Sequence, residues 1–406
     1  MNRRRPEPLA VPEEKKASYV LTNAGKFTEG DLTISKDGLQ IISPVSARSS
    51  SASSQEAVRA ITPEVNPATG PDLTLQDLEE LGIIGSGSSG VAKKVRNRHT
   101  GALLVLKVIQ FDVSSDTIRK QVTTELRTLY GASHQNIVKY HQAFFDNGAI
   151  TIVMEYCDGG SLADVLRAVS RTRPGQAVPE KYIAEIARQV PDMLVKAWHA
   201  AGLQREHPCM PDTMTWMTGR SLRHTMVVAG LVHLHKELHV VHRDIKPSNL
   251  LLTSTGALKI SDFGVSGQLT SSVSNCLSWV GTVTYMSPER IKGDQYSFDS
   301  DMWSLGLTLV ECALGRFPYP PPGDPSAAQQ PLGFWELLEY IVEEAVPVLP
   351  RGDPRFSAEL CDFVAKCLVK DARQRATIDV LSKHAFLRTH KGTNLAELLS
   401  WAVNAS

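Results

Sequence analysis

His242-Arg243-Asp244-Ile245-Lys246-Pro247-Ser248-Asn249 is the stretch of this sequence that decides the fold. Within it, Asp244 can accept the proton of an incoming hydroxyl, Lys246 can neutralise a phosphoryl group in transfer, and Asn249 can ligate magnesium. A polar loop between a helix and a strand would not need all of these residue types at these offsets. The stretch therefore predicts a catalytic loop for phosphoryl transfer.

Two further motifs follow the catalytic loop. Asp262-Phe263-Gly264 comes after the strand-like Leu258-Lys259-Ile260, and Asp262 is expected to coordinate a magnesium ion that bridges phosphates. Ser287-Pro288-Glu289 comes next, and Arg375 is predicted to bind the Glu289 carboxylate with both arms of its guanidinium. A solvated charge run is the alternative reading of the segment around Arg375.

A glycine-rich segment lies upstream. Gly85-Ser86-Gly87-Ser88-Ser89-Gly90 follows the pattern G-x-G-x-x-G, whose glycines let the backbone approach phosphates and donate N–H groups to them. By itself the pattern fits a glycine-rich turn equally well. A dinucleotide-binding loop would open a helix, whereas a β-like segment follows here, and the Gly-Lys-Ser/Thr ending of a Walker A loop is absent.

Lys107 ends the apolar run Leu103–Leu106 and needs an anion if its strand is buried, because an unpaired buried charge costs several kcal/mol. A surface lysine at a strand end is the commoner case. Residues 116–130 have apolar residues at helical spacing, and Glu125 on this helix is a candidate counter-ion. A lysine–glutamate pair of this kind orients nucleotide phosphates.

Bulk properties narrow the class of protein. A chain of 406 residues exceeds the usual size of one core, so two lobes or domains are expected. The 43 Lys and Arg balance 43 Asp and Glu, which favours neither a nucleic-acid binder nor a membrane-surface protein. The 6 cysteines lack C-x-x-C spacing and suit a reducing compartment, and no apolar run is long enough to span a bilayer. We expect a cytosolic or nuclear protein without nucleic-acid or membrane partners.

The pattern divides the chain into an N-terminal tail (1–77), a regular domain (78–387) and a C-terminal tail (388–406). Within the first part, residues 18–43 alternate weakly around Asp37-Gly38, a hairpin signal, and residues 44–71 are a linker rich in Ser, Ala and Pro. In the domain, strand-like segments come first and helical patterns dominate from about residue 180. A small β-rich lobe followed by a larger helical lobe is expected.

Residues 78–387 resemble a eukaryotic protein kinase domain with every catalytic motif in order. Four segments resemble MAP kinase kinases in particular: Gly159-Gly160-Ser161-Leu162, Gly264-Val265-Ser266-Gly267-Gln268-Leu269, Val280-Gly281-Thr282 and Tyr285-Met286-Ser287-Pro288-Glu289-Arg290. The resemblance implies an α+β, bilobal protein kinase fold, with a small antiparallel β lobe of five strands and one helix, a larger helical lobe, and ATP and Mg2+ bound between them. It also implies phosphate transfer from ATP to Thr and Tyr in the activation loop of a MAP kinase.

The resemblance also implies roles for single residues. Asp244 is the expected base, Lys246 assists the phosphoryl group, Thr282 positions the substrate hydroxyl, and Asn249 and Asp262 hold magnesium. For the phosphates of ATP, Gly85, Gly87 and Gly90 are expected to cover them, and Lys107 and Glu125 to orient them. Around adenine, Ala92 and Val105 are the expected roof, Met154 the gatekeeper and Leu251 the floor. Glu155 and Cys157, in the hinge, are expected to offer backbone groups to adenine.

Two regions outside these motifs bear on regulation and partners. Ser272 and Ser278 are separated by five residues, which resembles the S/T-x5-S/T pattern of plant-type MAP kinase kinases. A phosphate placed there by an upstream MAP kinase kinase kinase can pair with Arg243 and order the loop. Arg3-Arg4-Arg5 with Leu9 and Val11 resembles the docking peptide by which the family binds an acidic groove on its MAP kinase; a disordered basic tail is the alternative.

Two departures from the family pattern stand out. Ala92 stands where Val is usual and Val105 where Ala is usual, so the pair conserves volume, and we expect ATP still to bind. Residues 191–227 interrupt the expected helix before the catalytic loop, and we read them as a lineage insertion or as an intron translated in frame. Because of this insertion, the alternative is that the chain is a catalytically impaired scaffold that binds MAP kinases. A different serine/threonine kinase is a further alternative.

Overall fold

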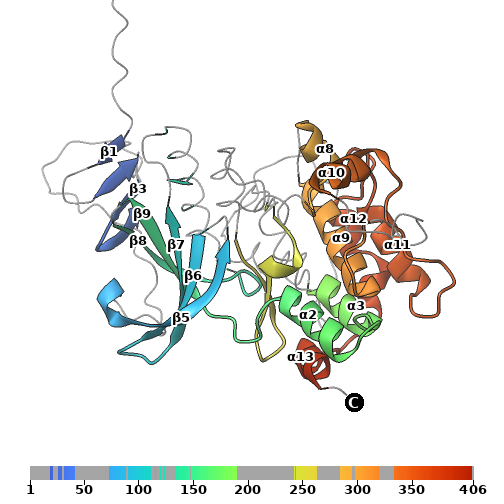
Figure 1. Cartoon of the computed structure of the whole chain (residues 1–406), viewed down its shortest axis with the longest axis horizontal. Coiled ribbons are helices and arrows are strands. Elements are labelled where there is room, and N and C mark those ends of the chain that lie inside the picture. The colour runs from blue at the N-terminus through green and yellow to red at the C-terminus, as the bar shows by residue number, and fades with distance from the viewer. Residues whose placement is uncertain are drawn as a thin grey trace, which may run out of the picture.

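The computed structural model describes residues 19–21, 26–29, 32–41, 73–87, 90–110, 115, 119, 122, 123, 126, 134–146, 148–189, 242, 244–262, 284–294, 298–319 and 333–404. These residues form a small β lobe and a larger helical lobe, joined by the chain that leaves the sheet near residue 155 (Figure 1). The two-lobed α+β architecture expected from the sequence is therefore confirmed.

A five-stranded antiparallel sheet is the centre of the small lobe. Its strands are β5 (Leu78–Gly87), β6 (Gly90–Asn97), β7 (Leu103–Gln110), β8 (Tyr140–Asp146) and β9 (Ala149–Glu155), in the order β5-β6-β7-β9-β8. Successive side chains point to opposite faces of a strand. On β8, Phe144 packs with Val153 in a cluster on one face, whereas Ala143 and Phe145 belong to the main core on the other.

A second, four-stranded sheet lies beside β8 (Figure 1). It consists of β1 (Tyr19–Leu21), β2 (Phe27–Glu29), β3 (Leu32–Ser35) and β4 (Gly38–Ile41), and β3 and β4 contact β8. The hairpin predicted at Asp37-Gly38 is confirmed; Ser35 pairs with Gly38, so the turn is centred on Lys36 and Asp37. This part of the predicted tail is folded against the small lobe.

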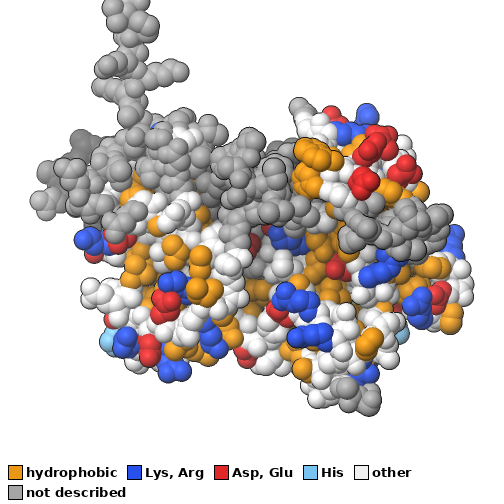
Figure 2. Space-filling view, viewed as in Figure 1, with side chains coloured by type: hydrophobic (Ala, Val, Ile, Leu, Met, Phe, Trp, Pro, Cys, Tyr) orange, Lys and Arg blue, Asp and Glu red, His pale blue; other side chains and the backbone are white. Residues whose placement is uncertain are grey.

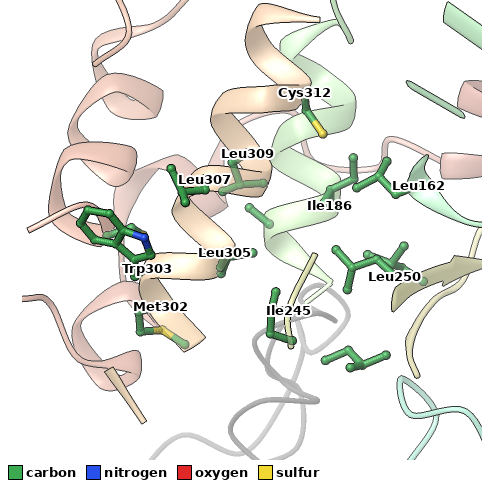
Figure 3. Packing of buried hydrophobic residues seen from close by; sticks show 14 of the residues in the cluster. Leu162, Ile186, Ile245, Leu250, Met302, Trp303, Leu305, Leu307, Leu309 and Cys312 are labelled. Carbon is green, nitrogen blue, oxygen red and sulfur yellow. The ribbon is translucent and has the colours of Figure 1, made fainter. Parts of the chain in front are cut away.

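The large lobe is built around one helix that is buried on nearly every side. Its helices are α2 (Leu162–Thr172), α3 (Glu180–Arg188), α8 (Pro288–Lys292), α9 (Asp299–Leu314), α10 (Phe334–Glu343), α11 (Ala358–Cys367), α12 (Ile378–Ser382), η5 (Ala385–Arg388) and α13 (Leu395–Val403). Leu305, Leu307 and Leu309 of α9 are fully buried. Figure 3 shows Ile245 of the catalytic loop among this core, between α9 and Leu250. Packing on α9 thus anchors the loop.

The segment predicted as a C-terminal tail contains a docked helix. α13 packs against α2 and α3, and Thr172 and Arg173 donate hydrogen bonds to the carbonyls of Ala402, Trp401 and Asn404. These bonds satisfy carbonyls that a helix end otherwise leaves without partners. The predicted insertion, 191–227, lies outside the described residues, and α3 ends just before it at Arg188.

The viewed surface carries acidic and basic side chains in mixture, as the balanced composition leads one to expect (Figure 2). Hydrophobic side chains also reach the viewed surface of the small lobe (Figure 2). On β5, Leu81, Ile83 and Ile84 are exposed. Among the helices that the structure describes, none is long and apolar enough to cross a membrane.

Candidate active site

The catalytic loop brings Asp244, Lys246 and Asn249 together as the sequence predicts. The Lys246 Nζ lies 2.8 Å from the Asp244 carboxylate. The Asn249 amide donates to the same carboxylate at 2.9 Å and to the Asp244 backbone oxygen at 2.8 Å. Asn249 ends the short helix η3 (Pro247–Asn249), whose first residue is a proline, a residue favoured at that position because it has no N–H to satisfy. All three side chains are thereby held in fixed positions.

Asp301 and His242 anchor this loop by hydrogen bonds. Asp301, on α9, accepts a hydrogen bond from the His242 backbone N–H at 2.8 Å. The His242 ring is buried, which lowers its pKa and keeps it neutral. Its Nε2 lies 2.9 Å from the Ser261 carbonyl, which can only accept, so this nitrogen carries the proton. Sequence reasoning missed Asp301; a carboxylate at the start of an apolar helix was the available signal.

Lys107 forms an ion pair with Asp262, next to the catalytic loop. The Lys107 Nζ lies 2.6 Å from the Asp262 carboxylate, and the lysine is buried. Burial alone raises the pKa of Asp262, but the charge and hydrogen bond of Lys107 outweigh it and hold this pKa below its usual value. The predicted partner, Glu125, lies outside the described residues. Among the described residues, the carboxylate that pairs with Lys107 is the predicted metal ligand.

The residues predicted to enclose adenine form one apolar cluster. Val105, Met154 and Cys157 are buried in it, and Ala92 and Leu251 pack against it. Val105 and Met154 are direct cross-strand partners. Burial raises the pKa of the Cys157 thiol to about 12, and the nearby Glu155 carboxylate adds to the effect. Val138 belongs to the same cluster, and sequence analysis did not identify it.

Ala92 and Val105 lie on adjacent strands in this cluster. Ala92 pairs with Lys107 and Val105 pairs with Lys94, so the two residues are diagonal neighbours on one face of the sheet. Their substitutions relative to the family pattern therefore affect one shared volume, as a compensated pair requires.

The described glycines of the glycine-rich segment lie at the end of β5 and the start of β6. Gly87 pairs with Gly90, and Gly85 pairs with Ala92. Gly90 has a φ of +113°, and a Cβ there would lie 2.1 Å from the Val108 carbonyl oxygen, so only glycine fits.

Glu155, a predicted hinge residue, binds two neighbouring segments through its side chain. Its carboxylate accepts a hydrogen bond from the Lys139 N–H at 3.1 Å and lies 2.9 Å from the Lys259 Nζ. Lys259 is on β11 (Leu258–Ile260), which pairs with β10 (Leu250–Leu252), the strand that bears Leu251. The floor and the hinge of the adenine cluster are thus linked by one ion pair.

The predicted bidentate pair between Glu289 and Arg375 is confirmed. The two guanidinium Nη atoms lie 2.8 and 2.9 Å from the two carboxylate oxygens, and both residues are buried. Arg375 also donates to the Val369 and Asp299 carbonyls. Arg375 thereby links Glu289 of α8 to Asp299 at the start of α9, the helix that also carries Asp301.

The remaining predicted site residues lie outside the described part of the chain: Glu125, Thr282, Ser272, Ser278, Arg3, Arg4, Arg5, Leu9 and Val11.

Comparison with known proteins agrees with this site. The family model described as protein kinase domain matches residues 78–202 and 213–387, so it is interrupted only at 203–212, inside the predicted insertion. "Mitogen-activated protein kinase kinase 2" from Arabidopsis thaliana is 38% identical over 392 residues, covering 96% of this chain and 91% of the relative. "Mitogen-activated protein kinase kinase SIPKK" from Nicotiana tabacum is 38% identical over 379 residues, covering 93% of this chain and 89% of the relative.

An animal relative is similar over a shorter span. "Dual specificity mitogen-activated protein kinase kinase dSOR1" from Drosophila melanogaster is 38% identical over 333 residues, covering 78% of this chain and 72% of the relative. The chain therefore belongs to the protein kinase family and, within it, to the MAP kinase kinases. It is an ATP-dependent protein kinase, and nothing in the described residues favours the scaffold alternative.

Proposed function

We propose that this kinase transfers the γ-phosphate of ATP to Thr and Tyr in the activation loop of a MAP kinase. The observation that carries the proposal is the convergence of three elements. Asp244, Lys246 and Asn249 form one group, and the charge of Lys246 acts on Asp262, which pairs with Lys107. Lys107 lies two residues along β7 from Val105 of the apolar cluster. A nucleotide whose base occupies that cluster directs its phosphates toward the charged groups.

In the proposed reaction Asp244 accepts the proton of the substrate hydroxyl, and the ammonium of Lys246, 2.8 Å away, stabilises the charge of the phosphoryl group. Thr282 would help to position that hydroxyl. Lys107, together with Glu125, binds and orients the phosphates, while Gly85, Gly87 and Gly90 cover them. Most of the rate enhancement then comes from positioning and electrostatics, as is general for phosphoryl transfer.

Asn249 and Asp262 are the proposed Mg2+ ligands. Both present oxygen atoms, the ligand type that Mg2+ prefers, and two protein ligands suit an ion that takes its remaining ligands from phosphates and water. The Asp262 carboxylate is ionised, because Lys107 holds its pKa down. When bound, Mg2+ neutralises phosphate charge as it develops.

Regulation and partners follow from the family. We propose that an upstream MAP kinase kinase kinase activates the chain by phosphorylating Ser272 and Ser278. The segment from Arg3 to Val11 serves as docking peptide for the substrate MAP kinase. The division into tail, kinase domain (78–387) with insertion (191–227) and C-terminal tail, and a cytoplasmic or nuclear location, belong to the same proposal.

The test uses the full-length chain with Ser272→Glu and Ser278→Glu, a catalytically inactive MAP kinase as substrate, and MgATP. The expected result is phosphate on both Thr and Tyr of the substrate loop, and its absence when Asp244→Asn is added. Phosphorylation of generic Ser/Thr peptides alone would contradict the assignment. If the chain is silent but becomes active after deletion of 191–227, that segment is the cause; if both forms bind the MAP kinase without activity, the scaffold alternative is correct.

A further inference from the structure

The four-stranded sheet at the N-terminus is a folded part of the small lobe that the proposed chemistry does not use. Phe27, Leu32, Ile34 and Leu39 of this sheet are buried. They belong to the main hydrophobic core, not to a separate cluster. The sheet is thus continuous with the core that supports the active site.

Gln142 fastens this sheet to the small lobe. Its side-chain oxygen accepts hydrogen bonds from the Leu39 N–H and from the Ala143 N–H, both at 3.0 Å. β8 is an edge strand, and the N-terminal sheet covers that edge. Gly38 has a φ of +126°, which is strained for any residue with a side chain, and a Cβ there would lie 2.7 Å from the Gln142 amide nitrogen, so that the Gln142 side chain would have to shift.

Phe27 of the N-terminal sheet packs on the face of the five-stranded sheet that carries Lys107. The Phe27 ring lies 5.9 Å from the ring of Phe145. Phe145 pairs with Ile150, which pairs with Ile109; two residues along each strand, Ala143 pairs with Ile152, which pairs with Lys107. Residues two apart share a face. Phe145 and Lys107 therefore point to the same side of the sheet.

A helix packs on this same face. Val122 and Leu126 are helical, buried and part of the cluster that contains Phe27, Phe145 and Ile109. Their spacing of four residues places them on one side of the helix. Glu125 directly precedes Leu126 in the sequence.

We propose that the N-terminal sheet is a positioning element for phosphoryl transfer. The packing of Phe27 on Phe145 and the bridge made by Gln142 hold the face on which the helix of Val122 and Leu126 rests, and so align the groups around Lys107. In this proposal Phe27 and Gln142 act through the helix and not on nucleotide or substrate directly. The inference depends on kinase activity alone and not on which protein accepts the phosphate.

The experiment uses the full-length chain and four variants. Phe27→Ala removes the aromatic contact, Phe27→Leu keeps most of its volume, and Gln142→Leu removes the shared acceptor while leaving the apolar packing intact. Leu78→Ala is the matched control, because Leu78 is buried in the cluster on the opposite face of the sheet. For each variant we would measure Tm, kcat and KM for ATP with and without protein substrate, and backbone hydrogen exchange in residues 116–130.

Phe27→Ala and Gln142→Leu should lower kcat about tenfold, as small misplacements of catalytic groups do. The KM for ATP should change less than about threefold, because the adenine cluster is a different cluster from the one that contains Phe27 and Phe145. Exchange in 116–130 should rise, and Phe27→Leu should restore most of the activity. Leu78→Ala should lower Tm without these changes. Equal kcat losses in Leu78→Ala, or unchanged exchange and kcat in Gln142→Leu, would overturn the proposal, even if Phe27→Ala fails to fold.

Discussion

The buried pair between Glu289 and Arg375 makes stability depend on pH in a way that one substitution can expose. Burial raises the pKa of Glu289, but the hydrogen bonds and charge of Arg375 outweigh it and lower this pKa from the ordinary 4.5 to about 2. Because the folded pKa lies below the unfolded one, the pair stabilises the fold fully above pH 4.5 and loses that effect as the pH falls toward 2. The difference corresponds to about 3 kcal/mol, at about 1.4 kcal/mol per pH unit.

Glu289→Gln replaces the carboxylate with a neutral group of the same shape, which resembles the protonated acid. We expect it to lower the free energy of unfolding by about 3 kcal/mol at pH 7. The gap from the unsubstituted chain should narrow steadily below pH 4.5. The assay is urea unfolding of both proteins from pH 7 to pH 3, followed by circular dichroism. Glu339→Gln, on the exposed side of α10, is the control and should change little.

A gap between the two proteins that stays constant from pH 7 to pH 3 would refute this reasoning, because a lost ion pair must titrate. A loss below about 1 kcal/mol at pH 7 would equally show that the pair is solvated like a surface salt bridge.

Three further outcomes are expected. Gly38→Ala should lower the stability of the small lobe by about 1–3 kcal/mol, since its φ of +126° is strained for alanine and the new methyl group meets Gln142; an unchanged Tm would contradict the hairpin register. Arg173→Ala removes donors to the Trp401 and Asn404 carbonyls, so hydrogen exchange in residues 395–403 should accelerate while exchange in α9 stays the same. With a pKa of about 12, Cys157 is about 0.01% thiolate at pH 8, so mass spectrometry should find almost no alkylation by iodoacetamide; rapid labelling would show that the thiol is not buried.

Much of the site could be predicted because its chemistry is concentrated in short motifs. Asp244, Lys246 and Asn249 lie within a few positions of one another, so their types and spacing are informative without any knowledge of the fold. The pairing of Glu289 with Arg375 was also predicted, from the Ser287-Pro288-Glu289 motif and from the fit of a guanidinium to a carboxylate, and the structure confirms it. The strands around the glycine-rich turn followed from their hydrophobic pattern.

Only the tertiary structure decided which distant faces meet. Nothing in the local pattern indicates that Asp301 holds His242, that Leu39 bonds to Gln142 across 103 positions, or that α13 docks on α2. Local periodicity specifies the type of an element and its apolar face. The partner of that face is set by the packing of the whole core, in which many weak contacts are satisfied together. The sequence by itself therefore determined the chemistry of this kinase, and the packed fold determined what holds that chemistry in place.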